Sequence, residues 1–225
     1  MRTTSGLTRY AIAVAGLVLA VTGCGAAPSA SPAPTSPTGS AAPSPSARPA
    51  ALWPAPLDPM ERTVQAGLKP GPKEFLANHV HAHLDVFVDG KPITVPAGIG
   101  IKIDDPHVRR FDEPDGSDAY GGIDLCNVPC ISPLHTHDAS GILHTESSEA
   151  EPNTLGEFFT EWGTVLDGSC VATFCSPATT IAIYVDGELT TGDPRAIQLT
   201  DQREIAIVIG TPSPQIPKTA DFSKA

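Results

Sequence analysis

Residues 79–90 read HVHAHLDVFVDG, and this stretch decides the fold class. Apolar side chains alternate with polar ones, which is the period of a β-strand that buries one face. The closing pair, Asp89 and Gly90, favours a two-residue hairpin turn, so residues 91–95 are expected to return beside the strand. One face carries Val80, Ala82, Leu84, Val86 and Val88, and the other carries His79, His81, His83, Asp85 and Phe87.

Residues 133–146 read PLHTHDASGILHTE and predict a second hairpin. With Ala139 and Ser140 as its two-residue turn, His135 lies opposite His144 on the neighbouring strand. A bulged three-residue turn would shift this register and move His144 away. One face of the hairpin then carries His135, His137, His144 and Glu146, and the other carries Leu134, Thr136, Leu143 and Thr145.

The chain therefore predicts a mainly β fold: a single domain of antiparallel hairpins with one or two packed helices. Residues 154–165 have the apolar stripe of a helix, with Asn153 or Thr154 as its cap. Residues 179–185 predict a strand that is followed by another Asp-Gly turn, at residues 186–187. The nearly continuous apolar run over residues 204–209 predicts a buried strand. We also expect a helix over residues 57–68, a helical turn over 73–78, a short strand over 99–103 and a polar loop over 104–122.

The cysteines inside this domain are even in number, which favours disulfides in an exported protein. Of three possible connectivities we favour the local one, which joins Cys126 to Cys130 and Cys170 to Cys175. A redox or thiolate-metal role is the alternative, because the CxxxC spacing of Cys126 and Cys130 is also that of copper-delivery relatives of thioredoxin. The strand and helix pattern around that motif is missing here.

The beginning of the chain has the pattern of a secretory signal. Arg2 and Arg9 give it a positive start, and the apolar run over residues 11–21 is shorter than the roughly 20 residues that span a bilayer. The run ends in Val-Thr-Gly-Cys at residues 21–24, which resembles the lipobox of bacterial lipoproteins. The resemblance implies that Cys24 is lipidated and anchors the mature protein on the extracytoplasmic face of the cell membrane. An ordinary signal peptide with an incidental cysteine is the alternative.

Composition predicts four parts: a lipoprotein signal peptide over residues 1–23, a tether over 24–56, the β-rich domain over 57–211 and a loose tail over 212–225. The tether is made mostly of Ala, Pro, Ser, Thr and Gly, which cannot bury enough apolar surface to offset the entropy of ordering it. The formal net charge is −11, and no cluster of Lys and Arg occurs. This balance argues against nucleic acid as a partner.

The two histidine segments hold six of the seven histidines and predict one transition-metal site. An H-x-H pair on a strand projects two imidazoles to the same side, about 7 Å apart at the backbone, so both can reach one ion. We leave His79 open between ligand and solvated residue, and we expect His107 to be a surface residue. Asp85 is expected to orient a histidine by accepting its ring proton, and Asp138 to form the turn. The predicted ligands are His81, His83, His135, His137, His144 and Glu146.

The same segments resemble a group of exported bacterial and archaeal proteins with the patterns HxHLDxFVDG and PLHTHDxSGxxHxE. Residues 81–90 and 133–146 match these patterns closely. The resemblance implies a common site but no particular activity. The H-x-H pairs also loosely resemble cupin sites, although the glycine and proline framework of that family is missing.

Imidazoles with a carboxylate suit zinc, copper(II), nickel or iron(II), and we favour copper(II) or zinc. One hypothesis is a binding module that captures, buffers or delivers the metal, with a possible protein acceptor that the sequence does not identify. The other is a metal-dependent enzyme, a cupin-like oxygenase or hydrolase, with Glu146 as general base. We favour the module, since no HExxH, phosphate loop or Gly-x-Ser-x-Gly occurs. A structural metal, or a hydrogen-bonded histidine core without one, is a third possibility.

Overall fold

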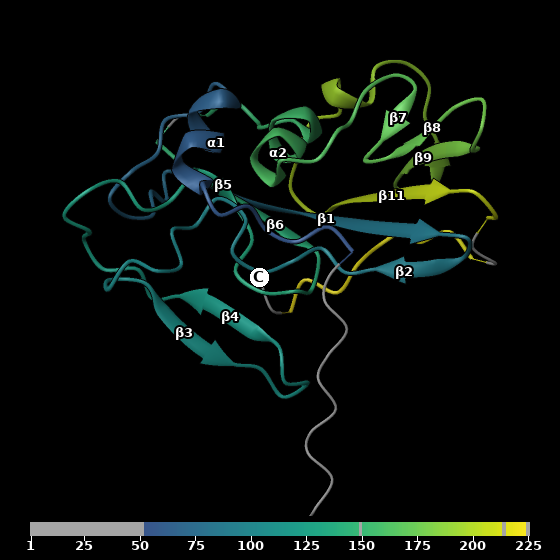
Figure 1. Ribbon diagram of the computed structural model, residues 1–225. Coiled ribbons are helices and arrows are strands. Elements are labelled where there is room, and N and C mark those ends of the chain that lie inside the picture. The colour runs from purple at the N-terminus through teal and green to yellow at the C-terminus, as the bar shows by residue number, and fades with distance from the viewer. Residues whose placement is uncertain (1–51, 149, 213–214, 224–225) are drawn as a thin grey trace, which may run out of the picture. The chain divides into compact units, whose positions relative to one another are not determined.

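One twisted β-sheet lies at the centre of the fold (Figure 1). The computed structural model describes residues 52–148, 150–212 and 215–223, which belong to one unit over residues 47–225. The expected signal peptide, Cys24 and the tether up to residue 51 lie outside the described residues. The strands follow the order β10-β9-β11-β1-β6-β5, and β2 also pairs with β1. Their bounds are β1 (Asn78–Val88), β2 (Lys91–Ile93), β5 (Leu134–His135), β6 (Ile142–Ser147), β9 (Ile181–Val185), β10 (Glu188–Leu189) and β11 (Arg203–Ile209).

The hairpins expected at the two Asp-Gly pairs are present. Residues 133–146 also pair in the expected register, but residues 136–141 connect β5 to β6 in place of the expected two-residue turn at Ala139 and Ser140. Strand β1 turns at Asp89-Gly90 into β2, and β9 turns at Asp186-Gly187 into β10. Both turns use positive φ at each central residue, which Asp and Gly tolerate. The domain is mainly β and its hairpins are antiparallel, as the sequence predicts.

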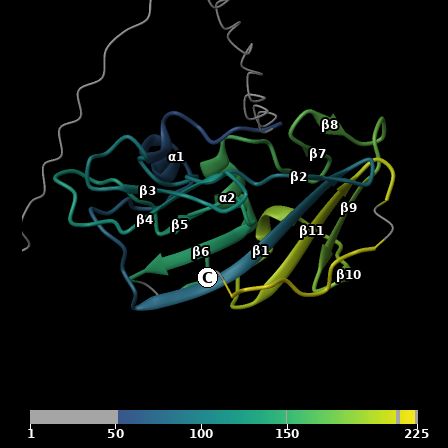
Figure 2. The same ribbon diagram turned by 90° about the horizontal axis from the view of Figure 1, so that it is seen from below.

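One central pair is parallel. Strand β11 pairs with β1 in parallel over seven residue positions, from Ala82↔Arg203 to Val88↔Ile209. Figure 2 shows β1 running between β6 and β11. Because β11 has neighbours on both sides, it is buried from Glu204 to Ile209, which explains its nearly continuous apolar sequence.

Two helices cover the apolar face of the sheet (Figure 1). Helix α2 (Leu155–Trp162) begins with a capping box between Thr154 and Glu157 and ends at Gly163 in the left-handed conformation. Its apolar side chains pack against the inward face of β1, where Ala82 and Leu84 are each 1% exposed. Helix α1 (Pro59–Gln65) packs against α2, and η1 (Pro194–Ala196) is a short 3-10 turn. Neither helix of the described residues is long and apolar enough to cross a bilayer.

Two local expectations are wrong, and a third is met only in part. The region expected to be a polar loop holds the β3–β4 hairpin, β3 (Arg109–Asp112) and β4 (Asp118–Gly121). Residues 99–103 form no strand, because Gly98 and Gly100 take positive φ on either side of Ile99. The turn expected over residues 73–78 is shorter than predicted: it includes only Leu76 and Ala77, and β1 begins at Asn78.

Both disulfides join near neighbours, as expected. They link Cys126 to Cys130 and Cys170 to Cys175. The second closes a small hairpin of β7 (Cys170–Val171) and β8 (Phe174–Cys175). These four positions therefore offer no free thiolate to a metal ion.

Candidate metal centre

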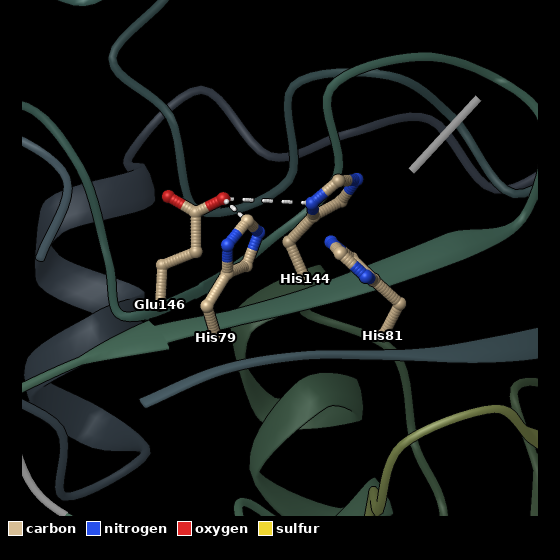
Figure 3. A group of neighbouring side chains, drawn as sticks. All are labelled: His79, His81, His144 and Glu146. Atoms are coloured by element: carbon tan, nitrogen blue, oxygen red, sulfur yellow. Dashed lines mark ion pairs between the residues drawn. The ribbon is translucent and has the colours of Figure 1, made fainter. Parts of the chain in front are cut away.

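The strand pairing gathers most of the histidines on the sheet face opposite the helices. Across the β1–β6 ladder, His79 lies opposite Glu146 and His81 opposite His144. Across β5–β6, His135 lies opposite His144, which is the register that the sequence predicts. In Figure 3 the side chains drawn from β1 and β6 all rise from the same side of the two strands. Alternation along β1, β5 and β6, together with the register of their pairing, accounts for this gathering except for His137, which lies in the connection after β5.

Two imidazoles are held in a defined tautomer by backbone carbonyls. Nδ1 of His135 lies 2.9 Å from the carbonyl oxygen of Ser132, and Nδ1 of His137 lies 2.6 Å from that of Tyr120. A carbonyl oxygen can only accept, so each Nδ1 carries a hydrogen, and the neutral ring has its lone pair on Nε2. The hydrogen bonds thus fix the orientation of both rings and leave Nε2 free, which is the arrangement typical of metal-binding histidines.

These two Nε2 atoms are 3.1 Å apart. Two lone pairs facing at this distance repel unless a cation or a shared proton lies between them. Tetrahedral zinc, with Zn–N distances of about 2.0–2.1 Å, holds two imidazole nitrogens about 3.3 Å apart. The pair of His135 and His137 therefore fits two ligands of one ion.

Glu146 provides the negative charge of the cluster. Its Oε1 lies 3.2 Å from Nε2 of His79, 3.6 Å from Nδ1 of His144 and 4.0 Å from Nε2 of His137. Burial raises the pKa of Glu146, but the contacts with His137 and His144 outweigh it and hold the pKa far below its usual value. The carboxylate is ionised at neutral pH. Its Oε2 is buried without a hydrogen-bond partner among the described residues.

Most of the imidazoles are neutral at pH 7. Burial, followed by the nearby His144, lowers the pKa of His81 to about 4, and burial also lowers the pKa values of His135 and His144. Burial acts in the same direction on His137, but Glu146 and the Tyr120 carbonyl raise its pKa overall. Neutral imidazoles are the form that binds metal, so the cluster is ready for an ion.

The described residues contain four groups whose donor atoms lie within 4.8 Å of one another and could hold a metal ion. Two lie apart from the cluster, Asp105 with His107 and the disulfide-bonded Cys126, and His83 with Asp85 and Glu204, and the other two overlap within it. The inner group is His135, His137, His144 and Glu146. The outer group is His79, His81, His144 and Glu146. His144 and Glu146 belong to both.

The structure places His83 outside the cluster, and Glu204 rather than the expected Asp85 contacts its ring nitrogen. Nδ1 of His83 lies 2.9 Å from Oε2 of Glu204, its Nε2 lies 3.0 Å from the Ser140 carbonyl oxygen, and Asp85 is 4.0 Å away. His83 sits opposite Ile142, the first residue of β6, so no donor of the cluster faces it across the ladder. Asp138 accepts a hydrogen bond from the Ser140 N–H at 2.9 Å, which is its expected turn role.

Several contributors were not predicted. His79 follows the same alternation as His81, and that signal could have included it. Glu74 has no sequence signal; burial and the charge of Glu146 raise its pKa, which places its carboxylate beside the cluster. Helix α2 contributes Glu161, which accepts a hydrogen bond from the Ser132 hydroxyl and so supports the residue whose carbonyl orients His135.

A cavity of about 520 Å³ opens beside the cluster, on the side of Glu146. Asn153, which is 7% exposed, also contributes to its wall, and its Oδ1 has no hydrogen-bond partner in the described part of the chain. The wall includes Lys69, Lys73, Phe75, Ser132, Glu146 and Asn153. Glu146 thus lies between the imidazoles and a space large enough for a small molecule.

Comparisons of the chain with protein-family models, with curated proteins and with solved structures found no match. The site is therefore interpreted from its own geometry and chemistry.

Proposed function

We propose that this chain is a lipid-anchored protein of the extracytoplasmic membrane face that binds copper(II) or zinc and captures, buffers or delivers it. The observation that carries the metal site is that the Nε2 atoms of His135 and His137 lie 3.1 Å apart while both Nδ1 atoms are committed to backbone carbonyls, so both Nε2 atoms face the same point.

The donor set supports copper(II) or zinc over other ions. It offers neutral imidazole nitrogens and one carboxylate, which suit borderline cations. Calcium and magnesium prefer oxygen ligands throughout, and copper(I) prefers sulfur. The four cysteines of the domain are paired as disulfides, so thiolates do not compete.

The proposed location rests on sequence and on chemistry. The lipobox-like run ending at Cys24 supports the anchor. Two disulfides are compatible with an oxidising compartment outside the cytoplasm. Mass spectrometry of the full chain from membranes tests this: a diacylglyceryl group on Cys24 is expected, and an unmodified Cys24 would contradict it.

The metal site is tested by elemental analysis of the full chain produced without an affinity tag. We expect about one equivalent of copper or zinc, lost in the double variant H135A/H137A and retained in H107A, because His107 lies in a separate group with Asp105. Acidification should release the ion as the imidazoles protonate, but only at a lower pH than an ordinary histidine would set, because burial lowers the pKa values of His135 and His144. Stoichiometric metal in H135A/H137A would contradict the assignment.

A metal-dependent enzyme is the second candidate, favoured by the cavity beside Glu146. In that function His135, His137 and His144 would hold the ion, which would supply Lewis acidity, and Glu146 on the cavity wall would be the residue that accepts a proton. Turnover of a small substrate that the loaded wild type performs and E146Q does not, at equal metal content, would favour the enzyme over the binding module.

A further inference from the structure

The imidazoles form a continuous path from the exposed His79 to the buried His135. Neighbouring ring centroids are 4.6 Å apart from His79 to His81, 4.6 Å from His81 to His144, and 4.5 Å from His144 to His137. The last step, from His137 to His135, is again 4.6 Å. Each step is short enough for one ion to gain a new ligand before it loses an old one.

Exposure distinguishes the two ends of this path. The side chain of His79 is 39% exposed, whereas that of His144 is 7% exposed and His135 is fully buried. A hydrated ion therefore reaches His79 from solvent, but it cannot reach His135 without passing other residues.

The two ends also differ in how firmly the rings are held. Both inner rings donate Nδ1–H to backbone carbonyls. In the outer group, Nε2 of His81 is buried without a hydrogen-bond partner among the described residues, and the ring of His79 contacts Glu146. Oriented ligands bind more tightly, since losing such an orienting bond costs about 10–100-fold in metal affinity. The inner position is thus the tighter one.

From these observations, and resting on the metal-binding function proposed above, we propose that one ion occupies two overlapping positions in turn. His79 and His81 load a copper(II) or zinc ion from solvent. The ion then exchanges these two ligands for His135 and His137 while His144 and Glu146 remain bound to it. The same path in reverse releases the ion.

The overlap favours one ion over two. Both positions require His144 and the carboxylate of Glu146, so simultaneous occupancy would divide two shared ligands between two ions. It would also hold two divalent cations within a few ångströms, with one carboxylate in contact with both groups to offset their repulsion.

A loading position has a distinct kinetic signature. Because it lies on the path but not at its end, removing it slows loading and release by the same factor. The ratio of the two rate constants, which sets the dissociation constant, is then unchanged. Removal of an inner ligand instead weakens binding and speeds release. The rival route is direct loading at His137, whose side chain is 24% exposed.

The test is stopped-flow binding of Cu²⁺ or Zn²⁺ alone to the full chain, with release measured by a competing chelator. We expect one equivalent in the wild type. In H79Q/H81Q both rate constants should fall by roughly tenfold, within the range over which association rates vary among related variants. H107Q, the matched loss of a histidine outside the path, should behave as wild type. H135Q/H137Q should keep weak, rapidly exchanging binding at the outer group.

Two equivalents in the wild type, or rates in H79Q/H81Q equal to those of H107Q, would overturn the loading path while leaving metal binding intact. Faster release in H79Q/H81Q would mean that His79 and His81 bind the ion in its final position, and this result would also overturn the loading path. Absence of metal binding in the wild type would instead overturn the proposed function. Circular dichroism of each variant confirms that it folds, and the H135Q/H137Q measurement tests the outer group independently.

Discussion

At the scale of single residues, the tautomers of His135 and His137 are the most informative feature of the site. Their Nδ1 hydrogens are committed to the Ser132 and Tyr120 carbonyls, so chemistry takes place at the two Nε2 atoms. Without metal, one Nε2 carries a proton and donates it in a hydrogen bond to the other Nε2. The raised pKa of His137 and the lowered pKa of His135 identify His137 as its carrier.

This assignment predicts different titrations for neighbouring rings. In metal-free protein, the His137 ring should titrate above 6.5, the ordinary value, while His135 stays neutral well below it. Histidine side-chain NMR across pH 4–9 measures both. Metal addition at pH 7 should displace the His137 proton, so the binding heat should depend on the buffer's ionisation enthalpy. Equal titration of the two rings would contradict the tautomer assignment.

The site residues were predictable from the sequence where period two applied. The alternation brings His81, His135, His137, His144 and Glu146 to the same face and places His135 opposite His144. It could not separate His83 from His81, because both point the same way from β1 and differ only in what lies across the ladder. The partner of His83, Glu204, comes from β11, and no local pattern specifies that pairing.

At the scale of elements, the connection from β5 to β6 fixes His137. It ends at Gly141, whose φ is +91°. A Cβ there would lie 2.8 Å from the Leu84 carbonyl oxygen and 2.9 Å from Nε2 of His83. This glycine is required both by its backbone conformation and by the close approach of β1.

We therefore predict that G141A destabilises the domain and weakens metal binding. Strain at such a position costs about 1–3 kcal/mol, and here a backbone contact adds to it. The matched control is G116A, in the β3–β4 turn, where φ is +81° but nothing lies within 4 Å of the added Cβ. Urea unfolding and metal titration of both variants measure the difference. If G141A is no less stable than G116A, the close approach is not the reason for the glycine.

Most elements with an apolar period were predictable, residues 99–103 being an exception, and elements without such a period were not. Helix α2 combines a stripe with a capping box, and both signals are local. Strand β3 has four exposed residues, so it shows no alternation, and its pairing with β4 was missed. The parallel pairing of β1 with β11 joins segments more than a hundred residues apart, and only tertiary packing selects it.

At the scale of the whole molecule, Glu161 couples stability to pH. It is fully buried in α2, and burial raises its pKa to about 8 from 4.5. Between these values the folded chain keeps a proton that the unfolded chain releases. Rising pH in this window therefore lowers the free energy of unfolding, by about 1.4 kcal/mol per pH unit, and the loss is complete above the folded pKa.

The variant E161Q cannot ionise, so its free energy of unfolding should lose this slope. Relative to wild type, E161Q should gain stability steadily from about pH 5 to pH 8, whatever constant cost the amide brings. Urea denaturation at several pH values measures both curves, and the histidine contributions are common to both. Parallel curves would show that Glu161 is ionised in the folded protein.

Metal binding should also stabilise the whole domain. An ion that binds only the folded state adds about 2.7 kcal/mol to the free energy of unfolding at 100 times its dissociation constant. Thermal unfolding with and without Cu²⁺ or Zn²⁺ should show a higher midpoint for wild type and a much smaller shift for H135A/H137A, which keeps only the weaker outer group. An equal shift in that variant would mean that the ion binds elsewhere.

The position of β11 in the sheet determines when the domain can fold during synthesis. A ribosome makes this strand after all the others, yet it fills the middle of the sheet, between β9 and β1. A nascent chain that has not reached Arg203 exposes two unpaired strand edges and cannot close its interior. A premature stop or a proteolytic cut upstream would thus yield an aggregation-prone fragment rather than a smaller working copy.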